Sequence, residues 1–136
     1  MATTTTPAKV LFTGKSHTTS GPDGATRSSD GFVDLKLPQP HPAAEDLFAS
    51  AWSACYLGAI ELAASQKRIK LAGHPSVDTQ IDLSRAGDSF LLRATLTVRV
   101  PGVDRAVAES LAEAAHGICP YSKAVHGNIE ISTSVI

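Results

Sequence analysis

Hydrophobic and polar residues alternate along several short runs, and each run predicts a β-strand. Residues 27–37, "RSSDGFVDLKL", alternate beyond a turn at Asp30-Gly31, and residues 127–136, "GNIEISTSVI", form a closing run. Residues 76–100 contain two alternating runs on either side of Ala86-Gly87-Asp88, which predicts a β-hairpin. A further run at 9–18 precedes the turn-rich segment "SGPDGAT", so the first strands are also expected to form a hairpin.

Two longer stretches have the pattern of helices. Residues 43–66 have no cluster of glycine and proline and are rich in alanine and leucine. Residues 101–118 place apolar side chains on one stripe after Asp104, a predicted N-cap, and this second helix is expected to end at Cys119-Pro120. One face of the first helix is apolar at Leu47, Ala51, Ala54, Cys55, Gly58 and Leu62, and the neighbouring face is apolar at Phe48, Trp52, Ala59 and Ala63. Such a helix must be buried, either centrally or against a partner subunit.

The order β-β-α-β-β-α-β, with hairpins and no repeated βαβ unit, predicts an α+β fold. We expect antiparallel sheets around two helices, the longer being the central helix at about 43–66. Residues 1–8, which are rich in threonine, predict a flexible arm, and residues 9–136 a single domain.

Composition excludes some classes of partner. The net charge is −1 and aromatic residues make up 5%, which gives no reason to expect nucleic acid or a membrane surface. No run approaches 18 consecutive apolar residues, and the N-terminus lacks a basic start followed by an apolar run. We therefore expect a cytoplasmic protein, in which the two cysteines do not form a structural disulfide. No Cys-x-x-Cys pair or close Cys/His cluster predicts a metal site.

The two cysteines, Cys55 and Cys119, are 64 residues apart, and local sequence favours a buried structural thiol for Cys55. A nucleophilic thiolate would need a cation from another part of the fold, because Cys55 lies too far into its helix for the helix dipole to act. Glu45, about 15 Å earlier along the helix, is either a first-turn acid or acts through such a cation or from a second chain. Cys119 is either a buried helix-end residue or a resolving thiol. His116, beside the apolar stripe of the second helix, is interpreted as a satisfied core histidine.

The segments "EDLFASAWSACYLGA" and "AAHGICPYSKAVHGNIEIS" together resemble the organic hydroperoxide resistance proteins, the Ohr branch of the Ohr/OsmC family. The resemblance covers roughly residues 9–136. It implies an intertwined homodimer with active sites at the subunit interface, which reduces organic hydroperoxides to alcohols. Cys55 would be the peroxidatic residue and Cys119 the resolving one, passing through a sulfenic acid and a Cys55–Cys119 disulfide. No bound cofactor or metal is implied; a dithiol, such as dihydrolipoamide on a lipoylated protein, would restore the thiols.

The chain departs from this family at the residue that activates the thiol. Glu45 matches the family acid that orients a catalytic arginine, but Pro22 stands at the arginine's position in "SGPDG". Three interpretations stay open: Arg27 substitutes, Lys15 or another cation substitutes, or the thiol is less activated. The alternative function is that of a divergent paralogue that binds a small apolar ligand at the dimer interface, with weak or no peroxidase turnover.

Overall fold

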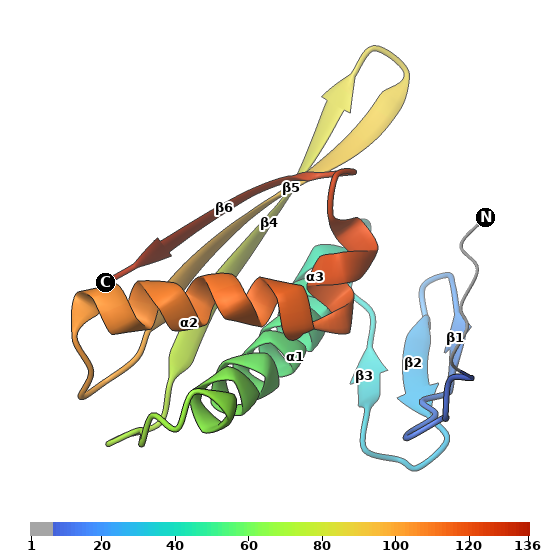
Figure 1. Ribbon diagram of the computed structural model, residues 1–136. Coiled ribbons are helices and arrows are strands. Elements are labelled where there is room, and N and C mark those ends of the chain that lie inside the picture. Colours follow the sequence, from blue (N-terminus) through green and yellow to red (C-terminus); the bar gives the residue numbers. More distant parts are fainter. Residues whose placement is uncertain (1–6) are drawn as a thin grey trace. The chain divides into compact units, whose positions relative to one another are not determined.

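The computed structural model describes residues 7–136, and the chain divides into two compact units, Met1–Ala43 and Ala44–Ile136 (Figure 1). Each unit is described by itself. The single domain expected over residues 9–136 stays a prediction, as does the flexible arm at 1–8, of which residues 1–6 lie outside the described part.

The smaller unit is a three-stranded antiparallel sheet in the order β1-β2-β3. Its strands are β1 (Ser16–Thr19), β2 (Ala25–Ser28) and β3 (Asp34–Lys36). The β1–β2 turn is closed by the Gly24 amide, which donates to the Gly21 carbonyl at 2.9 Å, and Gly21 has a φ of 97°. Pro22 occupies the second position of this turn, where the fixed φ of proline is favourable.

The first predicted strand is shorter than expected. Residues 9–15 of the run at 9–18 lie outside any strand, and β1 begins at Ser16. Val10, Leu11 and Phe12, whose composition suggested a strand, are all highly exposed. A β-branched or aromatic side chain favours a strand chiefly through packing against its neighbours, which these exposed residues lack.

The larger unit contains the remaining elements. They are α1 (Ala44–Gln66), β4 (Ser76–Ala86), β5 (Ser89–Arg99), α2 (Arg105–Ile118), α3 (Pro120–Val125) and β6 (Glu130–Val135). Its sheet has the order β4-β5-β6, and α1 and α2 lie on one face of it (Figure 1).

The predicted hairpin at 76–100 is confirmed as an antiparallel β4–β5 pair whose register begins at Ala86 and Ser89. The prediction of antiparallel sheets is wrong for β6, which pairs with β5 in parallel, with Arg93 opposite Glu130. The chain crosses back over the sheet through α2 and α3 before β6, and such a crossover is what a parallel pair requires. The short helix α3 was not predicted.

The core lies between the helices and the sheet. Its largest fully buried side chains are Trp52, Tyr56, Ile60, Leu96, Leu111, Val98 and Cys119. The buried face of α1 is therefore the one that contains Trp52 and Tyr56. The other apolar face, which contains Leu47 and Leu62, is largely exposed in the single chain: Leu47 is 37% and Leu62 47% accessible. Because apolar residues surround nearly the whole helix, hydrophobic periodicity alone does not distinguish its buried face from its exposed face.

An 18-residue window of α1 has a mean hydropathy of 1.4, so by length and composition alone this helix could cross a membrane. The sequence had led us to expect no such segment. Such a test is also passed by core helices. In this chain α1 packs Trp52, Tyr56 and Ile60 into the core of the larger unit, which is the behaviour of a core helix.

Candidate functional site

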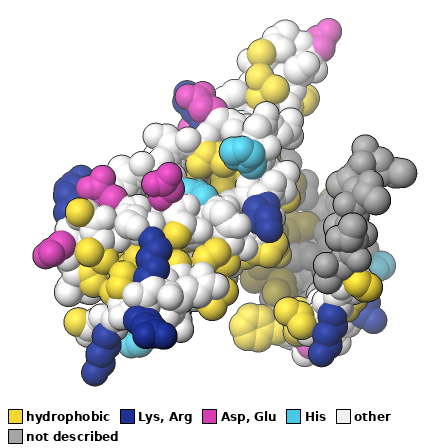
Figure 2. All heavy atoms as spheres, viewed as in Figure 1, with side chains coloured by type: hydrophobic (Ala, Val, Ile, Leu, Met, Phe, Trp, Pro, Cys, Tyr) yellow, Lys and Arg dark blue, Asp and Glu magenta, His cyan; other side chains and the backbone are white. Residues whose placement is uncertain are grey.

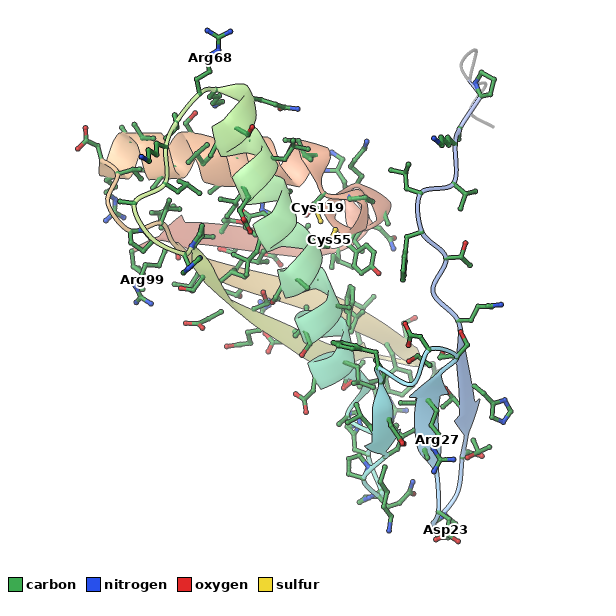
Figure 3. All side chains as sticks on the ribbon, turned by 90° about the horizontal axis from the view of Figure 1, so that it is seen from below. Asp23, Arg27, Cys55, Arg68, Arg99 and Cys119 are labelled. Carbon is green, nitrogen blue, oxygen red and sulfur yellow. The ribbon has the colours of Figure 1, made fainter. Side chains whose placement is uncertain are left out.

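The two cysteines lie side by side in the larger unit. Cys55 is near the middle of α1, Cys119 is at the junction of α2 and α3, and their sulfur atoms point toward each other (Figure 3). The Cys119 Sγ donates to the Cys55 Sγ at 2.9 Å, and both residues are free thiols. A disulfide needs the sulfurs about 2.05 Å apart, so a small shift would suffice to join them.

Backbone geometry explains why the second cysteine precedes a proline. Cys119 is the C-cap of α2, with its N–H bonded to the Ala115 carbonyl at 2.8 Å, and also the N-cap of α3. Its φ of −64° and ψ of 117° are extended, the conformation that a following proline favours. Pro120 occupies the first position of α3, where a missing N–H costs nothing. The dipeptide therefore turns the chain sharply and aims the completely buried Cys119 at α1.

The surroundings of Cys55 favour its neutral form. Burial raises the pKa of the Cys55 thiol, and the hydrogen bond and charge of Cys119 raise it further, while the backbone N–H of Tyr121 lowers it. None of these groups is a cation. A positive charge that would stabilise the thiolate must therefore be supplied by some group other than these neighbours.

A hydrogen-bonded chain of side chains stands behind Cys119. Trp52 Nε1 donates to Ser122 Oγ at 2.9 Å, and His116 Nδ1 is also 2.9 Å from that oxygen. The other ring nitrogen of His116, Nε2, is 2.9 Å from Thr133 Oγ1 on β6. Burial lowers the pKa of His116 below its ordinary value. The backbone N–H of Ser122 lies 3.5 Å from Cys119 Sγ, so this series of hydrogen bonds connects the core to the cysteine.

Sequence reasoning missed the part played by Ser122 and Trp52. His116 was interpreted as a satisfied core histidine, and its two hydrogen bonds and half-buried ring agree with that. The available signal was the close spacing of His116 and Ser122 on either side of Cys119-Pro120. The partnership with Trp52, 70 residues away, could not be seen in the sequence.

The other predicted site residues lie in the first turn of α1 or in the smaller unit. Glu45 is in the first turn of α1, about 15 Å from Cys55 along the helix axis. Arg27 is on β2 of the smaller unit, where its Nε donates to Asp34 Oδ1 at 2.9 Å in an exposed ion pair. Pro22 lies in the β1–β2 turn of the same unit. Among residues 7–136, no group of three His, Cys, Asp or Glu side chains is placed to hold a metal ion.

The chain matches the family model of OsmC-like proteins over residues 37–134. It is 35% identical to the organic hydroperoxide resistance protein of Xanthomonas axonopodis pv. citri, across 95% of this chain and 97% of the relative. It is 33% identical to the organic hydroperoxide resistance protein OhrA of Bacillus subtilis, across 92% and 96%.

Solved structures show the same likeness. The crystal structure of the organic hydroperoxide resistance protein OhrB of Bacillus subtilis is 33% identical, with a TM-score of 0.82 over 93% of this chain and 100% of that one. The corresponding protein of Elizabethkingia anophelis is 31% identical, with a TM-score of 0.85 over 94% and 98%. With sequence and fold agreeing over almost its full length, the chain belongs to the OsmC-like family, in its organic hydroperoxide resistance branch.

Proposed function

We propose that this protein reduces organic hydroperoxides to alcohols by means of Cys55 and Cys119. The observation that carries the proposal is the 2.9 Å approach of the two free thiols, one at the accessible edge of α1 and one buried behind it. The relatives' names, organic hydroperoxide resistance proteins, support a role in peroxide detoxification. Two thiols within reach of each other can be oxidised by peroxide and joined without a cofactor.

The proposed cycle has three steps. The Cys55 thiolate attacks the terminal, hydrogen-bearing oxygen of the hydroperoxide, the O–O bond breaks, and the alkoxide leaves as the alcohol after taking up a proton, so that Cys55 becomes a sulfenic acid. The Cys119 sulfur then attacks the Cys55 sulfur, a disulfide forms and water leaves. A dithiol reduces this disulfide by two exchange reactions and is itself oxidised to a disulfide. A lipoyl group on a lipoylated protein is our proposed dithiol, and the cytoplasm our proposed location.

The substrate class follows from the surroundings of Cys55. Ala51 and Gly58, one turn before and after Cys55 on the same exposed side of α1, offer an apolar or backbone surface next to the thiol. Such a surface gains free energy from contact with an alkyl or aryl group but not from hydrogen peroxide. We therefore propose fatty-acid or aryl alkyl hydroperoxides as substrates.

Activation of Cys55 is the part of the proposal that depends on residues outside its immediate neighbours. A cation oriented by Glu45 would lower the pKa of the thiol against the effect of burial. In this chain Arg27, Lys15 or a cation of a second chain would have to supply that charge, since Pro22 has none. The Arg27–Asp34 pair is exposed, so breaking it to free the arginine would cost little.

We also propose that the protein is a homodimer. The single chain leaves apolar side chains accessible on α1 and on the projecting end of the β4–β5 hairpin, where Figure 2 shows hydrophobic atoms at the surface. The larger of these side chains are Leu47, Leu62, Leu83, Phe90 and Leu91. A second copy covering them would remove apolar surface from water, which is the main driving force for association.

Sedimentation equilibrium should give a mass of about twice the 14.2 kDa of one chain. Replacing Leu62 with lysine should shift the mass toward that of one chain, because a charge would be buried at the interface. Glu113→Lys, an exposed substitution on α2, is the matched control and should leave the mass unchanged. A single-chain mass for the unaltered protein at micromolar concentration would contradict the dimer.

The function is tested by following hydroperoxide consumption with dihydrolipoamide as reductant. The unaltered protein should turn over repeatedly with cumene or fatty-acid hydroperoxide. Cys119→Ser should consume about one hydroperoxide per chain and then stop, because the sulfenic acid of Cys55 has no resolving thiol. Serine is a favoured N-cap residue, so this variant should keep α3 in place. Multiple turnovers by Cys119→Ser at the unaltered rate would contradict the two-cysteine cycle.

A divergent paralogue that binds a small apolar ligand with little turnover is the second candidate function. It is favoured by the raised pKa of Cys55 and by Pro22 at the arginine's position. The same assay separates the two functions. Sustained turnover by the unaltered protein excludes the second candidate, whereas tight binding of an alkyl compound without turnover would support it.

A further inference from the structure

Ser122 holds a central position in the larger unit, because its hydroxyl joins two helices that the sequence keeps far apart. The side chain is on α3, is almost fully buried, and its Oγ lies 2.9 Å from Trp52 Nε1 of α1 and 2.9 Å from His116 Nδ1 of α2. His116 in turn reaches β6 through Thr133 Oγ1. Four elements are therefore connected through one serine and one histidine.

The protons of this chain can be assigned by counting donors. An indole N–H only donates, so Ser122 Oγ accepts from Trp52. Ser122 Oγ has a second lone pair, but its buried hydroxyl proton also needs an acceptor, and His116 Nδ1 is the acceptor that the described contacts offer, so we assign Nδ1 as unprotonated. His116 is thereby the neutral tautomer with its proton on Nε2, where it donates to Thr133 Oγ1. Every group in the chain has a partner.

The same serine fixes the position of Cys119. Its backbone N–H donates to Cys119 Sγ at 3.5 Å, and Cys119 is the N-cap of the six-residue helix α3. So short a helix has little stability of its own and depends on tertiary contacts. Anchoring of the Ser122 side chain to Trp52 and His116 supplies such contacts directly beside the cysteine.

We propose that His116 is a positioning residue whose neutral imidazole, through Ser122, holds the Cys119 turn in place to form the disulfide with Cys55, and that protonation of His116 releases this turn. The proposal rests on the function proposed above, since it concerns the second step of that cycle. It assigns no contact with the substrate to His116.

Protonation would conflict with the hydrogen-bond pattern. A proton on Nδ1 would turn His116 into a second donor toward Ser122, which already accepts from Trp52. The buried hydroxyl proton of Ser122 would lose its acceptor, and leaving a buried donor unpaired is costly. Burial also holds the pKa of His116 below its ordinary value, so the neutral form prevails at neutral pH.

Charged groups of both signs border His116 on its open sides. A cleft of about 310 Å³ is lined by His116, Gly117, Lys123 and His126, and one of about 460 Å³ by Arg105, Glu109, Glu113 and the β6 residues Thr133 to Val135. From α1, the ring of Tyr56 packs at 4.7 Å between centroids, and burial raises the pKa of its phenol, which stays neutral. Lys123 and Arg105 oppose a charge on His116, whereas Glu109 and Glu113 favour one.

The experiment measures two signals over pH 5 to 7.5. One is the indole N–H resonance of Trp52, which is unique because the chain has one tryptophan. The other is the rate of Cys55–Cys119 disulfide formation after one equivalent of cumene hydroperoxide, followed by quenching and thiol counting. His116→Asn is the reference variant, because its amide oxygen can accept from Ser122 and does not titrate. Ionisation of the thiols affects both proteins alike, so the ratio of their rates isolates His116.

We expect the ratio of the unaltered rate to the His116→Asn rate to be near one at pH 7.5. It should fall at acid pH with the same midpoint, below about 6.5, at which the indole resonance shifts. His116→Leu should slow disulfide formation by about tenfold or more at pH 7.5, since small misplacements of reacting groups are costly in rate. Its rate of sulfenic acid formation on Cys55 should be unchanged. His126→Asn, which removes the neighbouring histidine of the cleft, should retain the unaltered profile.

Two results would overturn the proposal: a rate ratio and an indole resonance that do not change with pH, or His116→Leu with the unaltered rate. If His116→Leu fails to fold, Ser122→Ala takes its place, because it removes the same hydrogen bond between residues 116 and 122. Disulfide formation at the unaltered rate in Ser122→Ala would likewise overturn the proposal. Failure of the proposed function itself would be distinct, because no sulfenic acid would form on Cys55 in any variant. The titration of the Trp52 resonance would still test the link between His116 and Ser122.

Discussion

Replacing Cys55 with serine should reduce hydroperoxide consumption to the rate measured without protein. A serine hydroxyl is almost entirely unionised at neutral pH and forms no stable oxidised product corresponding to a sulfenic acid, so the first step of the cycle is lost. The change is nearly isosteric, and the site is only partly buried, so the fold should be retained. The loss would therefore reflect chemistry rather than unfolding.

The measurement is the decline of cumene hydroperoxide with time, in the presence of dihydrolipoamide. Ser65→Ala, on an exposed part of the same helix, is the matched control and should keep the unaltered rate. A second measurement is chemical trapping of sulfenic acid, which should label the unaltered protein and not Cys55→Ser. Rapid peroxide reduction by Cys55→Ser would remove Cys55 from the mechanism and with it the proposed function.

Replacing Pro22 with arginine should raise the rate of peroxide reduction by about tenfold or more. An unperturbed thiol is only a few per cent ionised at neutral pH, and a nearby cation can lower its pKa to below 7.5. Burial acts in the opposite direction on Cys55, which leaves room for such a gain. The second position of the β1–β2 turn accepts most residues, so an arginine should fit there. Loss of proline's restriction should cost roughly 0.4–1 kcal/mol of stability.

Two further variants identify the source of the charge. Pro22→Gln makes the same change of backbone without a cation and should leave the rate unaltered. Arg27→Gln in the natural background should slow the reaction if Arg27 already activates Cys55, and in that case Pro22→Arg would bring little gain. An increase with Pro22→Gln equal to that with Pro22→Arg would show that turn stiffness, not charge, limits the natural site.

Much of the fold could be predicted because alternation and turn residues act locally. The β4–β5 hairpin and the bounds of α1 follow from the sequence within a residue or so. The parallel pairing of β6 could not, because it depends on where α2 and α3 carry the chain across the sheet. Both of these faces of α1 are apolar in the sequence, and only packing in the larger unit distinguishes the buried Trp52 side from the exposed Leu62 side.

The candidate site was predictable only in part. The pairing of Cys55 with Cys119 came from the resemblance of two segments and agrees with the 2.9 Å separation of their sulfurs. Once the structure is known, Pro120 explains why Cys119 is both the C-cap of α2 and the N-cap of α3. The sequence alone did not predict α3, because six residues are too few to show a helical period. The link from Trp52 to Ser122 spans 70 residues, and no local pattern indicates such a contact.

The location of the aromatic side chains determines what spectroscopy reports about this protein. Trp52 and both tyrosines, Tyr56 and Tyr121, are in the larger unit, and Trp52 and Tyr56 are fully buried there. Tryptophan and tyrosine signals therefore originate in the cysteine-bearing unit and report its melting. Amide hydrogen exchange follows both units, so a difference between the two methods measures how far residues 7–43 unfold independently of the rest.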